Sequence, residues 1–303
     1  MADRDPAPHL VDDLRRRLRD AAGPDGGWSY YPGQASRLEP TAWALIALSA
    51  VDHAFAETQR AQLPAFLTGP IQTGDLLADA GSAGPNYAWN GLTLLALTAL
   101  QVSDDAPVRS RVVSALLKAK GIQLTSADPT VMRQNNQLQA WSWIAGTFSW
   151  AEPTAWCLLA LKKAGARSGD AATRIADAEA VLIDRVCHPG GWNYGNSAVF
   201  TQDLRPYVPT SALALLSMQD RRDHPAVASS LQWLEANATT ERSAMALGLA
   251  AVCLHVFNRP VDAVLAALAE QDAKTKFLDN AHLAAIALYA LTTREHGARA
   301  FTV

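Results

Sequence analysis

Helical periodicity runs along nearly the whole chain, and the alternating pattern typical of strands is almost absent. Two kinds of helical segment follow one another. The first kind is amphipathic: Leu10, Leu14 and Leu18 lie on one face of the first segment, and charged side chains surround the rest. Similar amphipathic segments start near residues 55, 107, 170, 223 and 260.

The second kind of segment is apolar on nearly all sides and must therefore be covered all round. Its members span residues 41–51, 91–100, 154–161, 211–218, 243–254 and 282–291. Six segments of each kind alternate strictly, which predicts an inner ring of buried helices inside an outer ring of amphipathic ones. The predicted fold is all-α, an α6/α6 barrel (toroid), with residues 1–303 as one domain because no linker rich in Pro, Gly or Ser divides them.

A short motif recurs at the start of the apolar segments. It reads RLEPTAWALIAL at 37–48, WAEPTAWCLLAL at 150–161 and, more weakly, YVPTSALALLSM at 207–218. Pro40 and Pro153 fit the first turn of a helix, where the missing N–H costs nothing. Thr210 stands in the same register after its proline. The motif therefore predicts repeated inner-helix starts.

Tight turns precede two of these starts, and one stretch breaks the rhythm. The turns PDGGWSYYPG (24–33) and HPGGWNYGN (188–196) contain Gly-Gly pairs that permit a sharp reversal, and the Trp that follows can wedge between neighbouring helices. Residues 126–150 are longer and more polar than their counterparts. We expect them to form an inserted short helix or a flap beside one rim of the barrel.

The stretches DGGWSYYPGQASRLEPTAWALIAL and GGWNYGNSAVFTQDLRPYVPTSALALL carry a family resemblance. They resemble the repeat of the squalene–hopene cyclase and protein prenyltransferase β-subunit superfamily. The resemblance implies an α/α toroid whose central cavity holds an isoprenoid chain. A single Glu stands where class II cyclases carry a cluster of acids, and the zinc-binding Asp-x-Cys pair and the Asp-Asp-x-x-Asp motif do not occur in the chain. We predict no metal and no cofactor.

Glu39 and Glu152 are the candidate catalytic acid and base, because both should lie at one rim of the barrel at the mouth of the cavity. The alternative is that they only pair with the helix dipole. Protonation of an alkene needs a neutral carboxylic acid, whereas a helix N-terminus favours the ionised form, and the local sequence supplies no partner that would reverse this. Two separated carboxylates also suit glycoside hydrolysis.

Aromatic and basic residues near the predicted inner-helix starts are the candidates for substrate binding. An aromatic cavity can hold an apolar chain and stabilise a carbocation, although the same residues can simply staple repeats together. Arginines there can hold a diphosphate or carboxylate or form solvated salt bridges. His282 can transfer a proton or bind a metal, or it can be an ordinary residue in the first turn of its helix. The candidates are Trp43, Trp89, Trp156, Tyr87, Tyr194, Tyr207, Arg37, Arg205 and His282.

Composition narrows the class of protein further. The chain has 303 residues, of which 49% are hydrophobic and 18% charged, with a net charge of −3 and no basic stripe, so we predict no nucleic-acid partner. No apolar run is long enough for a transmembrane segment, and three scattered cysteines favour reduced thiols in the cytoplasm. The predicted partner is a hydrophobic small molecule, an isoprenoid or isoprenyl diphosphate, bound by a terpene cyclase-like or prenyl-transfer enzyme. The alternatives are a non-catalytic lipid- or partner-binding scaffold and a carbohydrate-active enzyme.

Overall fold

A computed structural model describes residues 7–59, 72–73, 76–79, 81–103, 106–124, 131–166 and 169–303. Helices dominate, and they fall into the two predicted kinds. The inner helices are α2 (Leu38–Val51), α4 (Tyr87–Ala99), α6 (Ala151–Lys163), α8 (Val208–Ser217), α10 (Ala244–Val256) and α12 (Ala281–His296). The outer helices are α1 (Ala7–Asp20), α5 (Pro107–Lys118), α7 (Asp170–Asp184), α9 (Pro225–Asn237) and α11 (Asp262–Thr275).

The shorter elements lie in the connections. Residues 53–59 are helical and begin the segment predicted near residue 55, whose continuation lies outside the described residues. The antiparallel pairs are β1 (Gln72–Thr73) with β2 (Leu76–Leu77), and β3 (Ala198–Val199) with β4 (Gln202–Asp203). Three 3₁₀ turns complete the description: η1 (Gln219–Arg221), η2 (Ala238–Thr240) and η3 (Lys276–Asp279).

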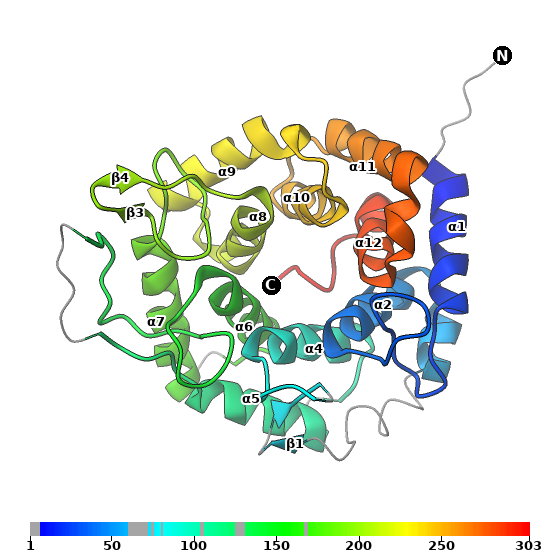
Figure 1. Ribbon diagram of the computed structural model, residues 1–303, viewed down its shortest axis with the longest axis horizontal. Helices are drawn as coiled ribbons and strands as arrows, with labels where there is room; N and C mark the ends of the chain where they lie inside the picture. The colour runs from blue at the N-terminus through cyan, green and yellow to red at the C-terminus, as the bar shows by residue number, and fades with distance from the viewer. Residues whose placement is uncertain are drawn as a thin grey trace.

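The inner helices form a ring that closes on itself. Each packs against the next along the chain, and α12 packs against α2 (Figure 1). The outer helices surround this ring, and nearly every residue of the inner helices is buried. The predicted α/α barrel is thus confirmed. Its physical cause is that helices that are apolar all round must be covered by neighbours on every side. No helix within the described residues is long and apolar enough to cross a membrane.

A tryptophan turn recurs before three of the inner helices and ties them to the outer ring. In each copy the Trp backbone N–H donates to a hydroxyl in the first turns of the following inner helix: Trp28 to Thr41 (2.8 Å), Trp141 to Thr154 (3.3 Å) and Trp192 to Ser211 (2.8 Å). The indole N–H donates to a carbonyl near the end of the preceding outer helix: to Leu18 (2.8 Å), Leu116 (2.9 Å) and Leu182 (2.7 Å), respectively. Trp28 and Trp192, which were expected to wedge between helices, therefore link an outer helix to the following inner helix through hydrogen bonds.

The same turns cap the first backbone N–H of an adjacent inner helix. The acceptor is always the carbonyl of the residue two positions after the Trp: Tyr87 donates to Trp143 (2.9 Å), Ala151 to Tyr194 (3.0 Å) and Ala281 to Tyr30 (3.0 Å). These bonds satisfy donors that a helix start leaves without partners. They also bring the beginnings of the inner helices to one rim, which we call the N-terminal rim.

One detail differs from the predictions, and a second concerns the inserted stretch, for which a short helix or a flap was expected. Ser211, and not Thr210, supplies the hydroxyl that corresponds to Thr41, because α8 begins one residue before its proline whereas α2 begins two residues before its own, so that Thr41 and Ser211 are each the fourth residue of their helix. Residues 131–150, the described part of the expected 126–150 insertion, contain turns and no helix. They form an irregular loop whose residues 140–143, Ala-Trp-Ser-Trp, are the third copy of the tryptophan turn.

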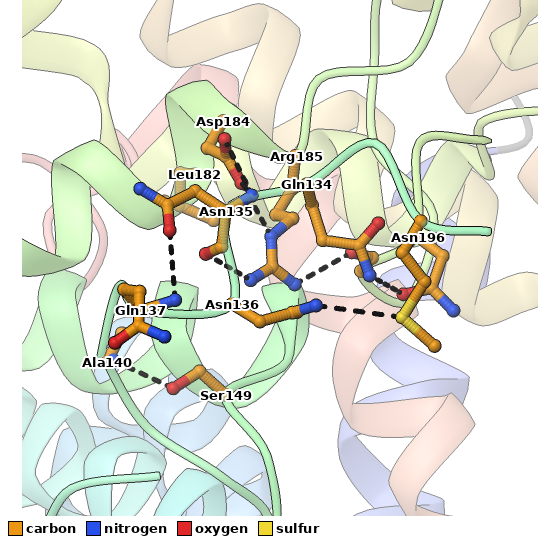
Figure 2. A network of polar contacts seen from close by, with 12 residues as sticks. Gln134, Asn135, Asn136, Gln137, Ala140, Ser149, Leu182, Asp184, Arg185 and Asn196 are labelled. Atoms are coloured by element: carbon orange, nitrogen blue, oxygen red, sulfur yellow. Dashed lines mark hydrogen bonds and ion pairs between the residues drawn. The ribbon is translucent and has the colours of Figure 1, made fainter. Parts of the chain in front are cut away.

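Polar contacts hold the irregular loop 131–150 against the turn before α8 (Figure 2). The backbone N–H of Asn135 donates to the carboxylate of Asp184 (2.9 Å), and Gln134 donates to Asn196 (2.7 Å). The buried guanidinium of Arg185 donates to the Gly195 carbonyl (3.0 Å) and to the Asn135 carbonyl (3.4 Å). These bonds satisfy buried polar groups and fix this part of the rim.

The end of the described chain fills the middle of the ring. After α12, Gly297 takes a left-handed conformation (φ +69°) that reverses the chain, and residues 298–303 run into the ring (Figure 1). We call residues 298–303 the return segment. Its Phe301 side chain is fully buried. The lumen, the space enclosed by the inner helices, is therefore occupied by protein.

Replacing Thr41 by Val should destabilise the fold by about 1–3 kcal/mol, because it leaves the N–H and C=O of Trp28 buried without their hydroxyl partner. The measurement is the urea unfolding midpoint. Thr98→Val is the matched control, since the Thr98 hydroxyl bonds only a carbonyl of its own helix. Equal midpoints for the two variants would contradict the stapling role.

Candidate functional site

Glu39 lies in the first turn of α2 and is only 7% exposed. The Tyr30 hydroxyl, from the tryptophan turn, donates a hydrogen bond to its carboxylate. His282 in the first turn of α12 places its Nε2 atom 3.4 Å from Glu39 Oε1. The closing contact between α2 and α12 therefore creates a buried Tyr–Glu–His cluster at the N-terminal rim.

Burial decides the protonation of this cluster. It raises the pKa of Glu39 to about 7, outweighing the hydrogen bond from Tyr30, and the nearby carboxylates of Glu152 and Asp79 act in the same direction. Burial also lowers the pKa of His282 to about 3. The Glu39–His282 contact lies within ion-pair distance, but Nε2 makes no hydrogen bond to any residue that the structure describes. We therefore assign a neutral imidazole, because a single poorly aligned contact does not offset the desolvation of two charges.

These shifts reverse the expectation drawn from the helix dipole. A helix N-terminus was expected to keep Glu39 ionised, with no local partner to oppose it. Removal from water has the larger effect here, and the partner residues come from segments distant in sequence. A carboxyl group that is part protonated near neutral pH can donate a proton.

Glu152 occupies the equivalent position in α6 and is 8% exposed. Burial raises the pKa of Glu152 to about 7 as well. Its charge also raises the pKa of Glu39, so the two carboxyl groups share one end of the ring. Within the described residues, its carboxylate has no hydrogen bond or ion pair. Glu152 is thus a buried carboxyl group without a polar partner in the described part of the chain.

Aromatic rings adjoin His282, which contacts Glu39. The ring of Trp43 is 6.4 Å from that of His282 and 5.9 Å from that of Trp156. Phe301 of the return segment lies 5.3 Å from Trp43 and 6.2 Å from Trp156, and Tyr289 of α12 lies 5.3 Å from Phe301. The indole nitrogen of Trp156 is buried and has no acceptor among the described residues. The site is therefore an aromatic core with a few polar atoms that no group within the described ranges satisfies.

The other predicted site residues lie away from this core. Tyr87 is buried in α4, where its carbonyl accepts from the Cys157 thiol (3.3 Å), and Trp89 packs on Trp143 with ring centroids 5.5 Å apart. Tyr194 and Tyr207 are 54% and 46% exposed, and their tilted rings pack against each other at the rim with centroids 5.2 Å apart.

The predicted arginines also lie at the rim. Arg37 precedes α2, where its charge acts on Tyr30 and Asp79, and Arg205 is exposed in the loop before α8. Of the predicted site residues, the structure brings together Glu39, Glu152, Trp43, Trp156 and His282.

Three residues of the site, Tyr30, Tyr289 and Phe301, lack a clear signal in the sequence. Tyr30 follows the Gly-Gly-Trp turn, and the recurrence of an aromatic two positions after each turn Trp is the pattern that could have identified it. Tyr289 looks like any apolar position of an inner helix. Phe301 follows a polar stretch, and no periodicity indicates that it enters the lumen.

No known protein-family profile matches the sequence, and no curated protein sequence matches it. Among solved structures, a variant of the type II terpene cyclase MstE from Scytonema in complex with its product merosterolic acid A aligns with a TM-score of 0.56 and 15% identity, over 94% of this chain and 96% of that chain. The cyclase without ligand aligns with a TM-score of 0.54 and 15% identity, over 88% and 77%.

Another variant of this cyclase, in complex with its substrate geranylgeranyl dihydroxybenzoate, aligns with a TM-score of 0.52 and 16% identity, over 96% of this chain and 80% of that chain. A glycosidase variant aligns with a TM-score of 0.47 and 12% identity, over 98% of this chain and 100% of that chain. At identities this low a likeness shows the fold alone. The chain has the α/α-barrel fold of the type II terpene cyclases.

Proposed function

We propose that this protein is a terpene cyclase-like enzyme that binds an apolar ligand of the isoprenoid class in its lumen and protonates it with Glu39. The observation that carries the proposal is a buried carboxyl group with a pKa raised to about 7, which contacts His282, whose ring in turn lies 6.4 Å from that of Trp43, at one end of a closed helical ring. Acid-initiated cyclisation needs a proton donor and a dry, aromatic surrounding, and both are found together here.

The environment of Glu39 suits an acid that must be neutral before it acts. Burial favours the protonated form in the resting site. After the proton has left, the Tyr30 hydroxyl donates to the carboxylate and stabilises it. A group that is neutral at rest and stabilised as an anion after transfer is matched to one proton donation.

The proposed reaction conserves the atoms of the substrate. The Glu39 O–H bond breaks, its proton forms a new C–H bond at a terminal alkene, and the electron pair of the alkene is consumed. The resulting carbocation is attacked by the next alkene of the chain, which closes a ring, while the faces of Trp43 and Trp156 stabilise the positive charge. A proton then leaves the final cation. Glu152, a buried carboxyl group with a raised pKa, is the proposed acceptor.

A non-catalytic binding scaffold is the second candidate, and a specific observation favours it. Phe301 occupies the aromatic part of the lumen, so the site as described is closed to an apolar chain. A protein of this kind would use the ring as a rigid frame and present its rim to a partner. The aromatic rim pair Tyr194–Tyr207 would belong to such a surface.

The experiment that tests the proposal is incubation of the purified full chain with farnesyl diphosphate, geranylgeranyl diphosphate and squalene in separate reactions. Each reaction is treated with phosphatase, extracted and analysed by gas chromatography and mass spectrometry. We expect a cyclic isomer from at least one substrate, because protonation followed by proton loss leaves the mass unchanged.

Two results would point elsewhere. The absence of product, combined with a lipid retained in native mass spectrometry, supports the binding scaffold. Sugar released from a glycan panel, and lost in Glu39→Gln or Glu152→Gln, supports the carbohydrate-active alternative. Heat-treated protein serves as the control for spontaneous acid-catalysed rearrangement of the substrates.

A further inference from the structure

We infer that the return segment, residues 298–303, is a displaceable internal ligand of the lumen, which an apolar ligand must replace in order to bind. The inference rests on the proposed function only for the identity of the competing ligand. The observation behind it is that the lumen recognises this segment through polar contacts to its backbone and through one aromatic anchor.

The backbone of the return segment is held by side chains from η1, α6 and α12. Gln219 in η1 is buried and uses both ends of its amide: Nε2 donates to the Phe301 carbonyl (2.7 Å), and Oε1 accepts from the Val303 N–H (3.1 Å). Lys163 at the end of α6 donates to the Thr302 carbonyl (2.6 Å). These side chains bind backbone N–H and C=O groups of the segment, as the side chains of a peptide-binding site do.

Phe301 is the anchor. Its ring is fully buried between Trp43, Trp156 and Tyr289, and the Tyr289 hydroxyl accepts from the Ala300 N–H (3.1 Å). A single buried aromatic surrounded by lesser contacts is the usual energetic centre of a binding interface. Phe301 thus covers the same rings that the proposed function assigns to an apolar ligand.

The two occupants exclude one another because they bury the same surface. If the segment must leave first, the apparent affinity for any lumen ligand is reduced in proportion to the fraction of molecules that are open. The joint for this movement is Gly297, whose left-handed backbone suits glycine and whose α-carbon faces open space apart from Arg299. A cavity of about 310 Å³, lined by Lys163, Arg299 and Ala300 among others, borders the segment at the opposite rim.

The first test is amide hydrogen exchange of the full chain without ligand, read by mass spectrometry on peptides that cover residues 298–303 and α12. We expect the return segment to exchange at least about 100-fold faster than the buried amides of α12, because it opens without unfolding of the ring. Lys163→Ala removes one hydrogen bond to the segment and should speed its exchange about five-fold. Lys118→Ala, on the exposed face of α5, is the control and should leave it unchanged.

The second test measures binding of geranylgeraniol by quenching of tryptophan fluorescence. Deletion of residues 298–303 should tighten binding at least about ten-fold, and Lys163→Ala should tighten it about five-fold. Lys163→Ala keeps the test usable if the deletion variant does not fold. Added geranylgeraniol should also speed exchange of the segment in the full chain.

The outcomes separate this inference from the proposed function. A return segment that exchanges only at the rate of the α12 core is a permanent part of the core, and the inference is then wrong even if products form. A segment that opens as expected, with no binding of geranylgeraniol to any variant, leaves the inference intact and contradicts the isoprenoid ligand. Equal geranylgeraniol affinity in the full chain, Lys163→Ala and the deletion variant would overturn the competition.

Discussion

Glu39→Gln is expected to lower the rate of product formation by about 10³-fold or more, because an amide has no acidic proton to give to an alkene. The amide has the size of the carboxyl group and can still accept the Tyr30 hydrogen bond, so the ring and its aromatic core should be unchanged. The rate is measured with the substrate that gives a product in the panel described above, by gas chromatography at several times.

Two further variants define the role of Glu39. Glu152→Gln should reduce the rate less, or change which isomer is released, since Glu152 is proposed to accept the final proton. Tyr30→Phe removes the donor that stabilises the Glu39 carboxylate after transfer and should slow the reaction by about 10-fold. A Glu39→Gln variant that keeps the parent rate would contradict the assignment of Glu39 as the acid.

The ring of helices could be predicted because its physical cause is the pattern of apolar residues within each segment. A segment such as 244–256 is apolar on every side, and only enclosure by other helices can bury all of it. The alternation with amphipathic segments then leaves a closed double ring as the arrangement that covers them. Local chemistry also locates the helix starts, because a proline such as Pro40 or Pro153 fits the first turn of a helix and disrupts its interior.

Details within the repeats were harder to predict, because equivalent positions carry different residues. The third tryptophan turn has Ala-Trp in place of Gly-Trp. Trp141 is recognisable only because it precedes Thr154 by 13 residues, the same sequence separation as between Trp28 and Thr41. The offset between Thr210 and Ser211 arises in the same way. The position within the helix, and not the order after the proline, determines which hydroxyl meets the Trp backbone.

The surroundings of Glu39 could not be predicted from its neighbours in sequence. His282 reaches it only because the last inner helix closes against the first, and Tyr30 reaches it only because its turn folds back over the rim. The raised pKa follows from burial by the assembled ring, which no local pattern reports. The occupation of the lumen by Phe301 depends in turn on a chain reversal at a single glycine.

The free energy of unfolding should depend on pH through three buried groups, Glu39, Glu152 and His282. The pKa of Glu39 and of Glu152 is about 7 in the folded chain, against an ordinary value of 4.5, so the folded state holds more protons than the unfolded state between these pH values. Their contribution is present below about pH 4.5 and is lost as the pH rises to about 7, at about 3 kcal/mol for each group. The neutral His282 acts in the opposite sense: its pKa is about 3 in the folded chain and 6.5 ordinarily, so stability is lost as the pH falls from 6.5 toward 3.

Glu39→Gln combined with Glu152→Gln should therefore be more stable than the parent at pH 8 by several kcal/mol and nearly equal to it at pH 4.5, because the amides carry no charge to bury. The measurement is the urea unfolding free energy of parent and variant at intervals from pH 4.5 to 8, and the difference between them isolates these two groups. Glu295→Gln, at an exposed position near the end of α12, is the matched control and should give a difference that stays near zero. A difference for the double variant that does not grow between pH 5 and 7 would mean that both carboxyl groups are ionised throughout, and Glu39 would then have no proton to donate at neutral pH.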